Sequence, residues 1–343
     1  MANNRTTLRE LSQLLDLSIS TVSKALSDSK EISEKTKERV KETAVIYNYR
    51  QNKLASCFRT GSTKVIGVVV PTLTDIFFSE VLSGIERYLS ANGYAMMVAV
   101  SDDSISKEAK VLKSLSNGFV DGLIISNAQE TLVKASNKSM SVPINDGIPM
   151  VLFGRKNPMV KCDQILNDFS TVSFQLVEYL HRSQKCNNIV AISTEDDIIN
   201  TRAKIDGFKQ ALNFFGLSHT LNSVLIYQKA DLINKISEVI EEGKFDGILC
   251  LDYASYNLLS GILTGLSAEV FDNIQVATFG NINLLKRLPC ASIDLQAKKI
   301  GRITARTLLD RIKDRKINYN GTRLIKGNLL NHKLTMDNEL RLY

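Results

Sequence analysis

Two series of short apolar runs most constrain how this chain can fold. Each series has four runs typical of buried parallel strands, and amphipathic segments of helical length separate them. The first series, VIGVVV, YAMMVAV, VDGLII and IPMVLF, occupies residues 65–70, 94–100, 120–125 and 148–153. The second, NIVAIS, SVLIY, FDGILCL and NIQVATFG, occupies residues 188–193, 223–227, 245–251 and 273–280. This alternation predicts two successive doubly wound α/β lobes, each built on a parallel sheet.

The same pattern predicts where a ligand binds. Doubly wound sheets hold ligands at the carboxyl ends of their strands, and a cleft between two lobes is the usual pocket. An aromatic ring at such a position can stack on a sugar or a base. The candidate residues that follow strand ends are Asp75, Phe77, Phe78, Arg155, Asp252 and Asn281.

The first 50 residues follow a helical pattern instead. Thr7 and Glu10 form a capping box that predicts a helix start, and Asp16 stands where the chain must turn sharply through left-handed backbone. Ser18 is expected to cap a second helix and Ser33 a third. The first helix would carry Leu8, Leu11, Leu14 and Leu15, and the inward face of the second would consist of Val22, Ala25 and Leu26. The third would place Val40, Ala44 and Tyr47 on one face.

The outward face of the second predicted helix is the informative one. It carries Ile19, Ser20, Thr21, Ser23 and Lys24, with no carboxylate among them. A helix in the major groove needs phosphate donors, small side chains for close approach and one or two residues that reach base edges. The pattern favours a helix-turn-helix over an ordinary pair of core helices, while the residues by themselves leave both interpretations open.

Charge is concentrated at the same end of the chain. Residues 1–64 hold 12 Lys and Arg against 7 Asp and Glu, whereas residues 65–343 hold 31 against 29. A basic head on a near-neutral body is expected where only the head meets a polyanion. A solvated basic surface would give the same count, so charge alone does not decide between them.

The cysteine count and the hydropathy pattern exclude several other classes of protein. The five cysteines are odd in number and include no CxxC pair, so no disulfide framework, zinc site or other metal site is predicted, and no cofactor is expected. There is no N-terminal apolar segment of signal-peptide type and no apolar run of membrane-spanning length. The sequence thus predicts a cytoplasmic protein with reduced thiols and no contact with a membrane.

Several ordered motifs resemble the lactose/galactose-repressor family of bacterial transcriptional regulators. In the head they are S-x-S-T-V-S-K-x-L at 18–26, S-x-x-T-x-x-R-V at 33–40 and Y-R-x-N-x-x-A at 49–55. The body adds DIFFSEVLSGIE, DGLIIS, FDGILC and a lengthened R-x-x-G-F between Arg202 and Phe208. The resemblance implies a helix-turn-helix domain at 1–50, a hinge helix and linker at 51–63, and an effector-binding and dimerisation domain at 64–343. That domain would consist of two periplasmic-binding-protein-like lobes, about 64–161 with 292–325 and about 162–291.

The resemblance also implies roles for individual residues. Base edges would be read by Ile19, Ser20 and Lys24, where Lys24 departs from the arginine that is usual in the family. Phosphates would be held by Thr7, Ser18, Thr21, Ser23, Ser33, Tyr49 and Asn52. Paired hinge helices would enter the minor groove through Leu54 and Ala55 with Phe58 as the apolar wedge. Arg202 would be the arginine that holds the effector, together with the strand-end residues above. Gly280 departs from the acidic or amide residue that is usual there.

These features predict a transcriptional regulator, most simply a repressor. Its partners would be a palindromic double-stranded operator, a carbohydrate or related small effector, and a second copy of the chain in a homodimer associated with the nucleoid. An α/β enzyme is the first alternative, but GxGxxG, GxxxxGK[ST], HExxH and GxSxG are all absent, and His181, His219 and His332 fit no triad or metal spacing. A sugar-binding transport protein is the second, opposed by the basic head and the lack of a signal sequence.

Overall fold

The computed structural model describes residues 6–49, 61–194, 198–217, 223–263, 265, 274–280, 290–314 and 321–331. The chain divides into two compact units, Met1–Thr63 and Lys64–Tyr343, and each is described by itself. No helix among the described residues is both long enough and apolar enough to cross a membrane. The described residues likewise contain no cluster of side chains suited to a metal ion.

The head is a three-helix unit of α1 (Leu8–Leu15), α2 (Ile19–Leu26) and α3 (Glu34–Ile46). All three predicted caps are confirmed, because the side chains of Thr7, Ser18 and Ser33 each accept a hydrogen bond from the first turn of the helix that follows. The capping box with Glu10 is complete, and Asp16 adopts left-handed backbone with φ 53°.

A small apolar core holds the three helices together. Leu11, Leu15, Val22, Ala25, Val40 and Ala44 are buried in it. Leu14 of α1 is 50% exposed, and Tyr47, predicted to share a helical face with Val40 and Ala44, is 46% exposed. Three short helices bury only a narrow stripe, which α1 fills with Leu11 and Leu15. Tyr47 follows the last residue of α3, so it no longer lies on that helical face.

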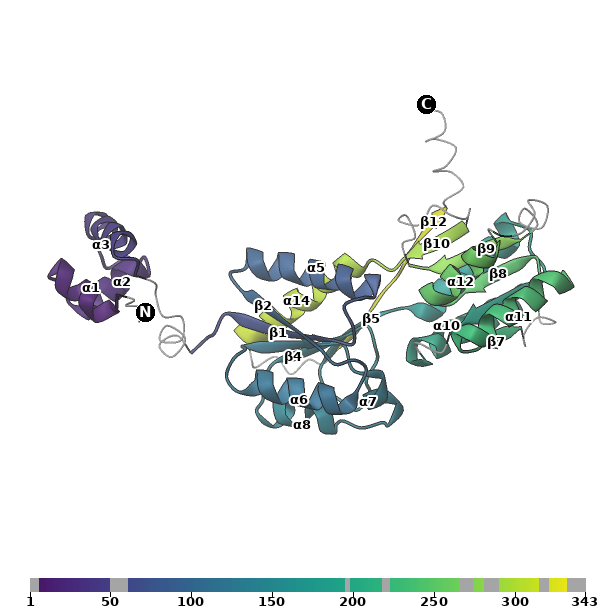
Figure 1. Ribbon diagram of the computed structural model, residues 1–343, viewed down its shortest axis with the longest axis horizontal. Coiled ribbons are helices and arrows are strands. Elements are labelled where there is room, and N and C mark those ends of the chain that lie inside the picture. Colours follow the sequence, from purple (N-terminus) through teal and green to yellow (C-terminus); the bar gives the residue numbers. More distant parts are fainter. Residues whose placement is uncertain are drawn as a thin grey trace, which may run out of the picture. The chain divides into compact units, whose positions relative to one another are not determined.

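The body is built on two six-stranded sheets (Figure 1). In the first sheet the strand order is β11-β5-β4-β3-β1-β2, and in the second it is β12-β10-β9-β8-β6-β7. Neighbouring strands are parallel, except for the antiparallel pair of β10 and β12. The first sheet comprises β1 (Val65–Val70), β2 (Ala95–Val100), β3 (Gly122–Ile125), β4 (Met150–Phe153), β5 (Asp163–Asn167) and β11 (Thr322–Ile325). The second comprises β6 (Ile189–Ser193), β7 (Val224–Ile226), β8 (Gly247–Cys250), β9 (Gln275–Phe279), β10 (Cys290–Asp294) and β12 (Asn328–Asn331).

Helices cover both faces of each sheet, as the alternation of runs predicts. In the first lobe α5 (Ile76–Ala91) and α14 (Ala297–Lys313) share a core with one face, and α6 (Ile105–Ser116) packs on the other (Figure 1). The short α7 (Gln129–Val133), η1 (Lys138–Met140) and α8 (Ser141–Asn145) follow β3. In the second lobe the helical elements are α9 (Phe169–Glu178), η2 (Tyr179–Ser183), α10 (Ile198–Phe214), α11 (Lys229–Glu242) and α12 (Tyr253–Leu263).

Two glycines allow α5 and α14 to pack at backbone distance. A Cβ atom at Gly84 would lie 2.2 Å from the carbonyl oxygen of Lys298, and one at Gly301 would lie 2.1 Å from that of Val81. Any side chain at either position would therefore push the two helices apart. This contact fixes the helical layer against the first sheet, where the N-terminal end of α5 borders the cleft described below.

The lobe boundaries differ from those predicted at 161/162 and 291/292. β5 completes the first sheet, so the chain leaves the first lobe only after Asn167, and β10 belongs to the second sheet as far as Asp294. The chain then returns to the first lobe for α14 and β11, and crosses a last time to β12. The prediction missed these points because β5, β10, β11 and β12 are short and include polar residues, so none of them forms a continuous apolar run.

Candidate DNA-binding face and effector cleft

The exposed face of α2 displays the side chains that the sequence predicted for base reading. Val22 and Ala25 are fully buried, which turns Ile19, 48% exposed, and Ser20 toward solvent. Thr21, Ser23 and Lys24 are partly exposed on the same short helix. A surface with one apolar side chain, several hydroxyls and a cation suits a groove lined by bases and phosphates.

Lys24 is engaged by a residue that the sequence pattern did not identify. Its Nζ atom forms an ion pair with the Glu31 carboxylate from the loop after α2. Both side chains are exposed, so the pair is weak and screened by salt. In the absence of DNA, however, the pair neutralises the one cation carried by α2. A DNA phosphate or base edge must therefore compete with Glu31 for Lys24.

The hydroxyls predicted to hold phosphates already cap the helices. The Thr7 hydroxyl lies 3.0 Å from a carboxylate oxygen of Glu10, to which it donates, and Ser18 Oγ lies 2.8 Å from Thr21 Oγ1. Ser33 Oγ forms the same contact with Thr36 at 2.8 Å. The caps leave other N–H groups of the first turns unbonded within the helix, and such groups attract phosphate.

Tyr49 is half-buried against the head core, where burial raises the pKa of its phenol. The side chain therefore stays protonated and keeps an O–H donor. Five predicted site residues lie outside the residues that the structure describes, so their roles stay predictions. They are Asn52, Leu54, Ala55 and Phe58 of the predicted hinge, and Asn281.

A cavity of about 430 Å³ lies where strand ends of both lobes meet. Five predicted residues line it: Asp75, Phe77, Phe78 and Arg155 from the first lobe, and Asp252 from the second. The two phenylalanines pack edge to face with ring centroids 5.5 Å apart. Phe78 is only 7% exposed and packs onward against Phe153, whereas the half-buried Phe77 leaves part of its ring to the cleft.

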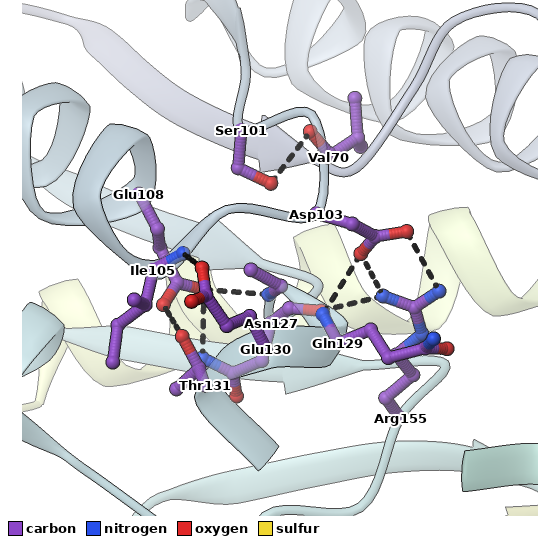
Figure 2. Close-up of polar contacts among 11 residues, drawn as sticks. Val70, Ser101, Asp103, Ile105, Glu108, Asn127, Gln129, Glu130, Thr131 and Arg155 are labelled. Atoms are coloured by element: carbon purple, nitrogen blue, oxygen red, sulfur yellow. Dashed lines mark hydrogen bonds and ion pairs between the residues drawn. The ribbon is translucent and has the colours of Figure 1, made fainter. Parts of the chain in front are cut away.

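Arg155 is held in a polar network at the strand ends of the first lobe (Figure 2). It is 4% exposed, forms a two-point ion pair with Asp103 and donates to the carbonyl of Asn127 at 3.0 Å. Asp103 in turn accepts from the backbone N–H of Gln129, the first residue of α7, at 2.8 Å. The guanidinium is thus fixed in direction, and its charge is balanced within the protein.

A buried carboxylate organises the other half of this network (Figure 2). Glu108 has no exposed surface and accepts hydrogen bonds from the Ala128 backbone N–H at 2.8 Å and from the hydroxyls of Thr131 and Ser139 at 2.5 and 2.6 Å. The Asn127 amide adds a fourth at 3.1 Å. A buried charge is tolerated only when it is satisfied in this way. Glu108 therefore ties α6 to the segment after β3, which includes the Asn127 carbonyl that accepts from Arg155.

Asp252 is occupied by the protein's own donors. It accepts from Ser193 Oγ and the Thr194 backbone N–H at 2.7 Å, from Thr194 Oγ1 at 3.2 Å and from the Ser255 backbone N–H at 2.7 Å. A carboxylate has about four acceptor sites, so these contacts leave little capacity for a ligand. The geometry gives Asp252 the role of joining the end of β6 to the start of α12.

Comparisons with known proteins agree with this architecture. A family model described as periplasmic binding proteins and sugar binding domain of LacI family matches residues 63–243, more than half of the chain. The HTH-type transcriptional regulator MalR of Streptococcus pneumoniae is 26% identical over 340 residues, which cover 96% of this chain and 98% of MalR. This chain belongs to the LacI family.

Two solved structures show the same fold. The lac repressor dimer bound to operator and the anti-inducer ONPF matches with a TM-score of 0.80 at 16% identity, and the complex of the transcriptional regulator CelR with cellobiose matches with 0.66 at 19%. Each match covers 95% of this chain and 98% of the other. As a LacI-family member the chain is a DNA-binding transcriptional regulator and not an enzyme.

The cation predicted to hold the effector, Arg202, is not the one that lines the cleft from α10. Arg202 is exposed and does not line the cavity, whereas Lys204 and Asn200 of the same helix do. Two residues along a helix turn the side chain by about 200°, so Arg202 and Lys204 point to nearly opposite sides. The role of Arg202 stays a prediction, and Lys204 is a candidate that the sequence reasoning missed.

Lys204 is a buried cation with its own supporting contacts. It is 6% exposed, its Nζ donates to the carbonyl of Leu251 at 2.6 Å, and it lies 5.0 and 4.8 Å from the ring centroids of Phe169 and Phe279. A sequence signal was available in Gly207 and Phe208. Gly207 has no room for a side chain against Ser170, and Phe208 is fully buried. Lys204 lies three residues before Gly207 and four before Phe208, so it shares their buried face of the helix.

Proposed function

We propose that this LacI-family regulator binds a palindromic operator as a homodimer through α2, under the control of a saccharide held in the cleft. The observation that carries the proposal is the composition of the cleft. Aromatic surface from Phe77 stands beside polar groups from Thr72, Thr74, Asn200 and Asp294. An aromatic ring that can stack on a sugar, surrounded by hydrogen-bonding groups on several sides, suits a rigid polyhydroxylated ligand. The cellobiose bound to the related CelR supports a sugar as the ligand class.

The edge strand β2 supports the homodimer. It pairs only with β1 among the described strands, and Met97 and Val98 are 44% and 37% exposed on it. Natural proteins protect such apolar edges, and a second copy of the chain would cover this one. Two heads are also what a palindromic operator requires, since its half-sites repeat about one helical turn apart. On this proposal the protein works on the nucleoid in the bacterial cytoplasm.

DNA selected from a random duplex library tests the DNA-binding half of the proposal. Lys24→Ala should weaken the selected duplex by about 1 to 3 kcal/mol and relax preference at one symmetric position. Tyr49→Phe should weaken all duplexes alike, because it removes only a phosphate donor. Fluorescence anisotropy with selected and scrambled duplexes measures both. Equal losses on both duplexes for Lys24→Ala would remove Lys24 from the base-reading set.

Thermal unfolding with a panel of saccharides tests the effector half. Cellobiose, maltose, glucose, ribose and fructose are suitable probes, since a ligand at 100 times its Kd adds about 2.7 kcal/mol of stability. A saccharide that stabilises the protein should also change its affinity for the selected duplex. A protein that no saccharide stabilises, or whose DNA affinity no saccharide alters, would overturn the proposal.

A further inference from the structure

The cleft carries more carboxylates than cations. Among the described residues that line it, the acidic side chains are Asp75, Glu80, Asp103, Asp252 and Asp294, and the basic ones are Arg155 and Lys204. A partly enclosed site with this excess of negative charge disfavours an anion, because like charges repel more strongly there than in bulk water. The balance therefore favours a neutral or cationic ligand over a phosphorylated one.

Most of these carboxylates already have partners within the protein. Asp103 pairs with Arg155, and Asp252 accepts the four hydrogen bonds described above. Glu80 lies 3.6 Å from the Lys298 ammonium. Asp75 caps α5 by accepting from the backbone N–H of the second residue of that helix at 2.7 Å. These groups shape the cleft and set its charge, but each already has a partner within the protein.

Asp294 keeps acceptor capacity. It is half-buried at the end of β10, and its Oδ1 atom accepts from the backbone N–H of Gln296 at 2.8 Å. Its Oδ2 atom has no hydrogen bond or ion pair to any residue within the described part of the chain. A carboxylate oxygen that lines a cleft in this state can accept from ligand hydroxyls.

The neighbouring strand leaves room beside this carboxylate. β9 and β10 pair with Phe279 opposite Ile293, which brings Gly280 alongside Asp294 at the strand ends. The Gly280 N–H donates to the Ile293 carbonyl at 3.0 Å, so the two strand ends stay in register. Gly280 has a φ of 94°, and a Cβ atom there would meet no atom of the described residues within 4 Å. Open space and a carboxylate thus stand side by side where both residues line the cavity.

We propose that Asp294 is the residue that selects the effector. Its carboxylate accepts hydrogen bonds from hydroxyls of an unphosphorylated saccharide seated over Gly280, and it repels sugar phosphates and sugar acids. The inference rests on the proposed function and narrows its ligand class. It assigns the choice between neutral and anionic sugars to the side chain of Asp294 alone. The excess negative charge of the whole cleft, by contrast, would disfavour any anion.

Paired probes test this selection in the full-length protein. Glucose, ribose and fructose are compared with glucose 6-phosphate, ribose 5-phosphate and fructose 1-phosphate by thermal unfolding and calorimetry, with cellobiose and maltose as larger neutral probes. Asp294→Asn keeps an oxygen for the Gln296 N–H but loses the charge. We expect it to weaken the best neutral saccharide by roughly 10- to 100-fold and to narrow the gap between that saccharide and its phosphate.

Two other carboxylates serve as comparisons. Glu80→Gln removes a charge from the cleft, but the lost group was paired with Lys298, so we expect a change of less than about threefold. Glu86→Gln removes an exposed carboxylate of α5 that does not line the cleft, and it should bind like the wild type. Asp294→Ala should lose the neutral saccharide at least as completely as Asp294→Asn does.

The outcomes separate this inference from the proposed function. If a saccharide binds the wild type and Asp294→Asn binds it equally well, Asp294 is not the selecting residue although the function stands. The same holds if Glu80→Gln matches Asp294→Asn, or if the wild type prefers the phosphorylated members. If no saccharide binds the wild type, the proposed function fails and this inference fails with it.

Discussion

At the scale of single residues, the DNA-binding surface proposed for α2 depends on an ion pair as much as on the residues of that helix. Lys24 is the only cation in that helix, and Glu31 neutralises it in the free protein. A phosphate that approaches Lys24 must displace the carboxylate or accept its repulsion. Glu31 thus tunes how much of the head's positive charge acts on DNA.

Glu31→Gln should therefore tighten DNA binding. With the competing carboxylate removed, Lys24 becomes available for a phosphate, so affinity at low salt should rise by roughly 2- to 10-fold and the salt dependence should steepen by up to about one released counterion. Anisotropy titrations at several salt concentrations measure both quantities. Glu38→Gln is the matched control, since it makes the same charge change at an exposed position of α3. An equal gain from both variants would show that net charge, not the release of Lys24, is responsible.

At the scale of elements, the first helix of the head depends on its capping box. The backbone N–H of Thr7 donates to Glu10 at 2.7 Å, and this hydrogen bond holds the pKa of the Glu10 carboxyl below its ordinary value. Because the folded pKa lies below the unfolded one, the contribution of Glu10 is fully present above the ordinary glutamate pKa of about 4.3 and is lost as the pH falls through the folded value.

Acidification should consequently loosen α1 before it unfolds the body. Amide exchange in α1, followed from pH 6 to pH 3, should lose protection in the wild type across the acid end of this range. Glu10→Gln retains an amide oxygen but no titrating charge, so its protection should be lower at pH 6 and should change less with pH. A Gln variant that follows the wild-type profile would mean that another carboxylate governs the helix start.

The contact between α5 and α14 offers a test of packing in the body. Gly84→Ala would place a methyl group 2.2 Å from a backbone oxygen, which no side-chain rearrangement can relieve, so we expect a loss of about 1 to 3 kcal/mol in the free energy of unfolding. Gly261→Ala in α12 is the control, since a Cβ there meets nothing within 4 Å, and it should be neutral or stabilising by up to about 1 kcal/mol. Urea unfolding of both variants measures the difference.

Elements differ in how well the sequence predicts them. The eight strands predicted from continuous apolar runs are all present: β1, β3, β4, β6, β8 and β9 are buried, whereas the edge strands β2 and β7 are partly exposed. β5 was missed because the side chains at its polar ends bond to distant residues: Asp163 accepts from Arg311 and the Gly321 N–H, and the Asn167 amide N–H donates to the Leu295 carbonyl. Lys24 was identified while its partner Glu31 was not, because Glu31 stands in the loop after α2, where no helical pattern indicates which way its side chain points. Local patterns give the caps, helices and central strands, whereas contacts across the chain decide which side chains stand in the cleft.

At the scale of the whole molecule, a ligand in the body can change the affinity of the head for DNA only through a free energy shared between the two sites. If a saccharide changes DNA affinity by some factor, operator DNA must change saccharide affinity by the same factor. Typical couplings are about 1 to 3 kcal/mol, or roughly 5- to 150-fold. The side chain best placed to register the ligand is Lys204, which contacts α9, the end of β9 and the carbonyl that follows β8.

Lys204→Met should abolish this coupling. Methionine fills the space between Phe169 and Phe279 but gives the Leu251 carbonyl no donor and the ligand no cation. Operator affinity without saccharide should stay within about twofold of wild type, and addition of saccharide should no longer change it. Arg202→Ala removes the exposed cation two residues earlier and should retain the full response. Operator titrations with and without the stabilising saccharide measure both variants, and saccharide titrations with and without operator check that the coupling is equal in both directions. A response that persists in Lys204→Met but disappears in Arg202→Ala would return the effector-holding role to the arginine that the sequence motif predicted.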